Sequence, residues 1–171
     1  MNEWHDPVEI NPARELLQRS DPSGSGTSSP VTQVLTNVAQ EDAFEMQRLF
    51  ELLRTGAHVW NAQFDQFLPT CWRRLSIMHW TPVHVARRAA ELLVTGAETR
   101  VLDVGSGPGK FCVIGALATL GQFTGVEQRP HMVDFSRSFA RKYKIPRVHF
   151  LRANAMDLNW RLYSAKPEAL L

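Results

Sequence analysis

The chain has 171 residues, of which 44% are hydrophobic and 21% are charged, and its formal net charge is +2. These totals are typical of an ordinary globular protein of one domain, which buries roughly two-thirds of its unfolded surface. So small a charge, without a long basic run, argues against nucleic acid as a partner. The sequence shows no signal peptide and no apolar run of membrane-spanning length, so we expect a cytoplasmic protein that does not bind membranes.

Residues 1–30 are predicted to form a flexible arm and linker, and residues 31–96 a helical region. The end of the arm, residues 21–30, is rich in Ser, Gly and Pro and has almost no apolar groups, which favours mobility. The first helix is expected over residues 31–54, because apolar residues recur there at helical spacing. This helix either packs on the domain that follows or forms a lid over a substrate, and we favour simple packing.

Residues 58–80 are rich in aromatic side chains interspersed with basic ones. Such a mixture can mark nucleic-acid binding, because bases stack on aromatic rings. Trp60, Phe64 and Phe67, however, follow helical spacing and fit one stripe that faces the core. We therefore predict a packed helix here, which Pro69 ends.

The next helix is predicted to begin at Pro82, after an N-cap at Thr81, and to end near Gly96. Thr81 suits the N-cap position and Pro82 the first helical position, while Gly96 suits a C-terminal cap. Small alanines on one face should let this helix lie close to its neighbour.

From residue 97 on, strand patterns and helix patterns alternate. Strands are predicted over residues 101–104, 122–127 and 148–151, with helices over 110–120 and 130–143 between them. Right-handed crossovers then place the three parallel strands side by side, with the first strand at one edge and both helices on one face. We therefore predict an α/β fold, a Rossmann-like three-layer sandwich that is partial, with a β-α-β-α-β half over residues 97–171.

A glycine bend, residues 105–109, joins the first strand to its helix and limits the kind of ligand. A phosphate-binding P-loop would need its first glycine at Val104 and a hydroxyl at Phe111, and it has neither. A dinucleotide fingerprint that starts at Gly105 needs Gly or Ala in its last position and finds Lys110. What remains is an acid two residues before three alternate glycines.

That pattern, Asp-Val-Gly-Ser-Gly-Pro-Gly over residues 103–109, resembles motif I of the class I S-adenosylmethionine-dependent methyltransferases. Glu127 ends the next strand, as an acid does in this family where it binds the cofactor ribose. Residues 150–158 resemble the third motif of the family, with Ala-Asn in place of Gly-Asp at 153–154. Trp-Thr-Pro at 80–82 resembles the start of the helix before motif I in several members. The resemblance covers roughly residues 80–157, about half the chain.

The resemblance implies S-adenosylmethionine as the cofactor and no metal, and it implies a role for each matching residue. The glycine bend and the helix start receive the carboxylate of the cofactor, Glu127 accepts from the ribose diol, and Asn154 with Ala155 reads the adenine edge. Asp103 orders the bend and seats the amino group, while Trp80 and Thr81 approach the methionine end. The predicted binding residues are Trp80, Thr81, Asp103, Gly105, Ser106, Gly107, Pro108, Gly109, Glu127, Gln128, Asn154 and Ala155.

The function that the resemblance implies is in-line transfer of a methyl group to an unidentified acceptor, a small molecule or a protein. No catalytic base can be named, because the acceptor residues of the family follow a fourth strand and residues 160–171 predict no strand. We therefore expect a truncated or split methyltransferase, whose first strand is an edge that a second copy or a partner chain covers. A non-catalytic module that binds S-adenosylmethionine and an NAD-linked oxidoreductase are the alternatives.

Overall fold

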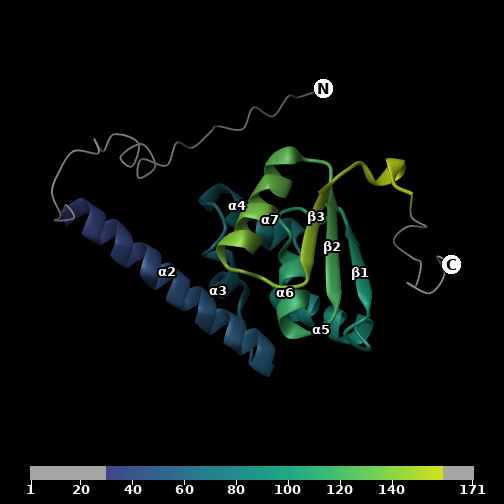
Figure 1. The fold of residues 1–171 in the computed structure, drawn as a ribbon, viewed down its shortest axis with the longest axis horizontal. Coiled ribbons are helices and arrows are strands. Elements are labelled where there is room, and N and C mark those ends of the chain that lie inside the picture. Colours follow the sequence, from purple (N-terminus) through teal and green to yellow (C-terminus); the bar gives the residue numbers. More distant parts are fainter. Residues whose placement is uncertain (1–29, 160–171) are drawn as a thin grey trace. The chain divides into compact units, whose positions relative to one another are not determined.

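The computed structural model describes residues 30–159 and confirms the predicted α/β fold (Figure 1). The chain forms two compact units, residues 1–44 and 45–171, and the boundary falls within helix α2, Pro30–Thr55. The predicted tail, residues 160–171, and the predicted arm up to residue 29 lie outside the described residues. The sheet and the helices from α3 on lie within the second unit.

One sheet of three parallel strands, in the order β1-β2-β3, forms the centre of the second unit. The strands are β1 Arg100–Val104, β2 Gln122–Glu127 and β3 Val148–Arg152, and Figure 1 shows β2 between the other two. Helix α6, Lys110–Ala118, connects β1 to β2, and helix α7, Pro130–Lys142, connects β2 to β3. Each of these five elements lies within two residues of its predicted bounds, and both helices pack against β2 and β3.

Helix α6 lies between the sheet and helix α5, Val83–Leu93. The helix approaches the sheet closely at Gly115. A Cβ at this position would lie only 2.3 Å from ring carbons of Phe123. Neighbours on both sides explain why the helix is apolar nearly all round, since such a helix is normally buried. Cys112 on this helix is a buried cysteine that forms no disulfide.

The region before α5 contains two short helices, α3 Asn61–Asp65 and α4 Thr70–His79. The predicted core stripe is only partly right, because Phe64 is buried and Phe67 is half-buried, whereas Trp60 is exposed. The reason is that α3 spans only five residues and Trp60 precedes it, where its ring contacts His58. Helix α4 was not predicted from the sequence.

The predicted bounds of α5 need correction at both ends. The helix begins at Val83, and the N-cap is Pro82 rather than Thr81. A distant side chain supplies the cap, because Asn61 Oδ1 accepts a hydrogen bond of 2.7 Å from the Val83 amide. The helix ends at Leu93, before it reaches Gly96.

A continuous hydrophobic core joins the end of α2, the short helices and the sheet. The buried members of the core include Met46, Leu49, Phe50, Leu53, Val59, Phe64, Leu68, Val83, Ala86, Ala90, Val101, Val113, Ile114, Leu117, Phe123, Val133, Phe139 and Phe150.

None of the helices in residues 30–159 combines the length and the apolar character needed to cross a bilayer.

Candidate cofactor site

The glycine bend is attached directly to the end of β2. The amides of Gly105 and Ser106 both donate to the carbonyl of Val126, at 2.8 and 3.0 Å. Gly105, Gly107 and Gly109 have φ angles of 78°, 56° and 82°, in the left-handed region that glycine adopts without a steric penalty. The backbone of the bend therefore accounts for all three glycines.

Two of these glycines have very different surroundings. A Cβ at Gly109 would lie 2.4 Å from the ring of Phe150, so this glycine is needed for packing. A Cβ at Gly105 would meet nothing within 4 Å, so this glycine leaves open space at the carboxyl ends of the strands. Ser106, Gly107 and Pro108 are buried beneath that opening, and Ser106 Oγ has no hydrogen-bond partner among the described residues.

Glu127, at the end of β2, is bonded to the bend. Its Oε2 accepts a hydrogen bond of 3.1 Å from the Gly107 amide, although 20 residues separate the two in the sequence. Its Oε1 accepts a hydrogen bond of 2.9 Å from the Arg129 amide. Two motifs that were identified separately in the sequence therefore form one connected structure.

Arg129 is a site residue that the sequence analysis missed. Its guanidinium contacts both carboxylate oxygens of Glu127, with Nε donating to Oε1 at 2.9 Å and Nη2 donating to Oε2 at 3.0 Å. Burial alone would raise the pKa of Glu127, but hydrogen bonds from the Arg129 side chain and from the amides of Arg129 and Gly107 lower that pKa to about 2. The only available signal was a basic residue two positions after the strand-ending acid.

A pocket of about 340 Å³ opens at the carboxyl ends of the strands. Five of the twelve predicted residues line it, from all three motifs: Gly105, Glu127, Gln128, Asn154 and Ala155. The register explains this convergence, because β2 and β3 are paired up to Glu127 and Arg152, and the Ala153 amide then donates to the Glu127 carbonyl at 3.1 Å. Val104, Val126, Arg129 and Ala153 complete the lining.

Asn154 already uses one side-chain atom for the local fold. Its Oδ1 accepts a hydrogen bond of 3.1 Å from the Met156 amide and caps the short 3-10 helix η1, Ala155–Asp157. An amide oxygen has two lone pairs, so the same atom retains capacity for a further donor. The residue is exposed at the rim of the pocket.

Trp80 and Thr81, the predicted neighbours of the methionine end, do not line this pocket. Trp80 does reach the bend, because its Nε1 lies 3.7 Å from the position that a Cβ on Gly107 would take. Its ring also makes an edge contact with Trp72 of α4, with centroids 6.1 Å apart. Thr81 is exposed.

Asp103, the acid of motif I, faces helix α6. Its Oδ2 accepts a hydrogen bond of 3.5 Å from the Cys112 thiol. Burial raises the pKa of Asp103, the thiol lowers it in part, and the nearby charge of Glu127 raises it further. Within the described contacts, Glu127 rather than Asp103 is the acid that hydrogen-bonds the bend.

Lys110, directly after the bend, belongs to a buried cluster that the sequence did not predict. Its Nζ donates to Asp65 Oδ1 of α3 at 2.8 Å and to Ser76 Oγ of α4 at 2.9 Å. The side chains of Lys110 and Asp65 are only 2% and 7% exposed. The cluster thus attaches the first residue of α6 to the helices that precede the sheet.

Comparison with known proteins identifies the segment that carries the site. Residues 96–166 match a family described as "Methyltransferase domain". No curated protein sequence matches the chain.

Several solved structures resemble part of the chain. An RNA methyltransferase from Salinibacter ruber in complex with S-adenosyl-L-homocysteine is 25% identical, with 47% of this chain and 53% of that chain covered and a TM-score of 0.44. The YcgJ protein of Bacillus subtilis is 27% identical, with 44% and 32% covered and a TM-score of 0.40. The [4+2]-cyclase SpnF is 30% identical, with 44% and 30% covered and a TM-score of 0.39. The chain therefore spans about half the length of the first structure and about a third of the other two.

Proposed function

We propose that the chain is a class I S-adenosylmethionine-dependent methyltransferase, which binds S-adenosylmethionine and transfers its methyl group to an acceptor, because residues 96–166 match a methyltransferase domain. The observation that carries the proposal is the bond between Glu127 and the Gly107 amide at a pocket that Gly105 and Asn154 also line. The glycine bend, the acid that ends β2 and the motif after β3 therefore meet at one pocket. The acceptor is proposed to be a small molecule or a protein.

The residues of the pocket suit the parts of the proposed cofactor. The Glu127 carboxylate is an acceptor for a ribose diol, and Asn154 with the Ala155 amide offers an acceptor and a donor for the adenine edge. The amides that start α6 favour the carboxylate of the methionine moiety, because a helix N-terminus attracts anions. Trp80 beside Gly107 is proposed to bound the methionine end.

When bound, S-adenosylmethionine supplies a methyl group on a positively charged sulfur, ready for displacement. The contribution of this chain is to bind, to orient and to exclude water, since in-line methyl transfer depends chiefly on alignment. Glu127 and the glycine bend fix the adenosyl end relative to the start of α6, and this fixes the direction in which the methyl group points. No described residue is assigned as a catalytic base.

Calorimetric titration of the purified chain with S-adenosylhomocysteine tests the proposal, with NAD titrated in parallel. We expect binding of S-adenosylhomocysteine, and we expect Glu127→Gln to weaken it about tenfold to a hundredfold, because hydrogen bonds to a charged acceptor contribute about 1.5–3 kcal/mol. Glu98→Gln, at an exposed glutamate away from the pocket, is the control and should leave affinity unchanged.

The alternatives correspond to other results of the same experiments. Binding of NAD without S-adenosylhomocysteine would indicate the oxidoreductase and overturn the proposal. Binding of S-adenosylhomocysteine without transfer of labelled methyl to any acceptor would instead indicate a non-catalytic binding module.

We also propose a partner and a location. The outer edge of β1 has no strand beside it among the described residues, so a second copy or a partner chain is proposed to cover it. The cytoplasm is proposed because Cys71 and Cys112 are both free thiols, as is usual in a reducing compartment.

A further inference from the structure

The carboxylate that would bind the ribose is already fully engaged by the chain itself. Glu127 Oε1 accepts from the amide and the Nε of Arg129, and Oε2 accepts from Nη2 of Arg129 and from the Gly107 amide. A carboxylate has about four lone-pair positions, and these four donors use all of them. A diol that donates two hydrogen bonds to Glu127 must therefore displace two of the present donors.

The two kinds of donor differ in how easily they can leave. The amides of Gly107 and Arg129 belong to the bend and to the start of α7, and their positions are set by the backbone. The guanidinium is carried by a flexible side chain that is 50% exposed, whereas the Glu127 side chain is 4% exposed. The two guanidinium bonds are thus the pair that a ligand can replace.

The position of Arg129 also lowers the free-energy cost of releasing its guanidinium from Glu127. Arg129 is the N-cap residue of α7, a helix of 13 residues, and the positive end of a helix dipole disfavours a cation. The half-exposed guanidinium regains hydration when it leaves, and the ribose hydroxyls then take its place on the buried Glu127 carboxylate. Among the described residues, the carboxylate of Glu127 is the group that binds the guanidinium at the pocket.

We propose that Arg129 sets the affinity of the pocket for adenosyl ligands, because its guanidinium occupies the two Glu127 oxygens that the ribose diol needs and must swing out when the ligand binds. This inference rests on the proposed function, since it presumes that the pocket receives an adenosyl group. The geometry of the present pair matches a diol, because its two donors lie 2.9 and 3.0 Å from the two adjacent carboxylate oxygens, as the hydroxyls of a vicinal diol would.

The test is calorimetric titration of wild type, Arg129→Ala and Arg129→Lys with S-adenosylhomocysteine. Arg129→Ala should bind about threefold to tenfold more tightly, which corresponds to removal of a competing pair worth about 0.6–1.4 kcal/mol. Arg129→Lys should fall between the two, because an ammonium cannot form the planar bidentate pair. Salt should reduce the difference between wild type and Arg129→Ala, because screening weakens the pair.

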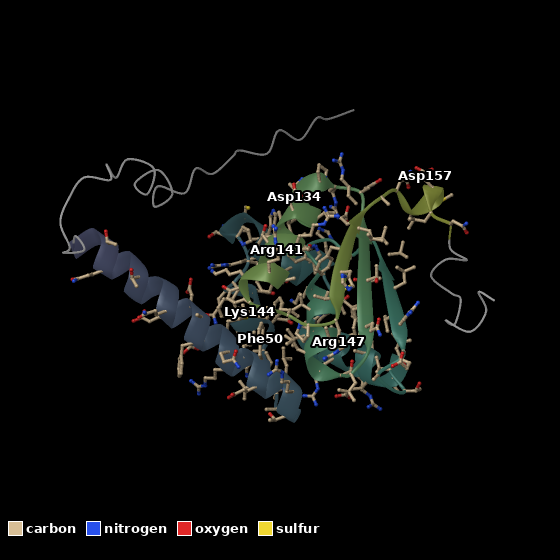
Figure 2. The ribbon with its side chains drawn as sticks, in the orientation of Figure 1. Phe50, Asp134, Arg141, Lys144, Arg147 and Asp157 are labelled. Atoms are coloured by element: carbon tan, nitrogen blue, oxygen red, sulfur yellow. The ribbon has the colours of Figure 1, made fainter. Side chains whose placement is uncertain are left out.

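Arg141→Ala is the matched control. Arg141 is an exposed arginine of the same helix whose Nη2 contacts only the Ser138 hydroxyl, at 3.5 Å, among its hydrogen bonds to described residues. Figure 2 shows it well apart from Asp157, which follows the end of β3. The Arg141→Ala variant should bind S-adenosylhomocysteine with the same affinity as wild type.

A second pair of ligands distinguishes the contribution of the ribose diol from that of the rest of the ligand. The gain in Arg129→Ala should appear with adenosine and vanish with 2′,3′-dideoxyadenosine, which has no diol to compete for Glu127. Weaker or unchanged binding of S-adenosylhomocysteine by Arg129→Ala, with wild type binding normally, would overturn this inference alone. If no variant bound the ligand, the proposed function would fall, and this inference with it.

Discussion

Lys110 shows how single residues outside the pocket hold the site in place. It follows Gly109 directly and forms an ion pair of 2.8 Å with Asp65, and both side chains are almost fully buried. The ring of Phe64 also lies 5.7 Å from its Nζ. A buried pair is weak proof of net stabilisation, but the loss of one member leaves an uncompensated charge in the interior.

We predict that Lys110→Met lowers the free energy of unfolding by about 3–5 kcal/mol, because the buried Asp65 carboxyl then loses its ion-pair partner. Urea denaturation followed by circular dichroism measures this. The double variant Lys110→Met with Asp65→Leu should regain most of the loss, since neither charge is then buried.

The control is Arg88→Met, at an exposed arginine 3.4 Å from Glu91. Its loss should stay below about 1 kcal/mol, as is usual for surface pairs. Equal small losses for Lys110→Met and Arg88→Met would show that the buried pair does not matter for stability.

Sequence reasoning identified the residues of the pocket better than the contacts between them. The resemblance to the family motifs nominated Glu127 and the glycines, and their positions after strands agree with it, because ligands bind at strand ends in such sheets. Lys110 was recognised only as a mismatch to the dinucleotide fingerprint. Its partner Asp65 lies 45 residues earlier, and nothing in local periodicity links two such positions.

At the scale of elements, predictability follows the strength of the local signals. The strands and helices from residue 100 on were predicted within two residues, because apolar runs alternate there with clear turn residues. Helix α4 carries basic and polar residues among its apolar ones and has no capping side chain, so its sequence gives little signal. The start of α5 was misplaced because its cap comes from Asn61, in another element.

This cap gives a direct prediction. Asn61→Ala should lower the free energy of unfolding by about 1 kcal/mol, because the Val83 amide loses its acceptor at the helix start. Thr81→Ala is the matched comparison, since Thr81 is the cap that the local sequence suggests but is exposed and outside the cap position. It should cost less than about 0.5 kcal/mol. A larger loss for Thr81→Ala than for Asn61→Ala, in the same urea titration, would contradict this account of the cap.

At the scale of the whole second unit, the sequence was sufficient for the topology. Right-handed crossovers with both helices on one face give the order β1-β2-β3, and this order leaves β1 with one paired edge and one open edge among the described residues. Parallel strands are normally buried on both faces, yet Val104 of β1 is 51% exposed. An open, apolar edge of this kind is a template for pairing with another chain.

We predict that the 171-residue chain dimerises through β1, because a twofold axis would place two β1 strands antiparallel and extend the sheet across both copies. Sedimentation velocity over a dilution series should show a mass that rises with concentration. Leu102→Lys, on β1, should shift the chain to monomer, since a charge on an edge strand opposes pairing. Leu120→Lys adds the same charge at an exposed site after α6 and should leave the association intact. A wild-type chain that stays monomeric at every concentration would refute the prediction.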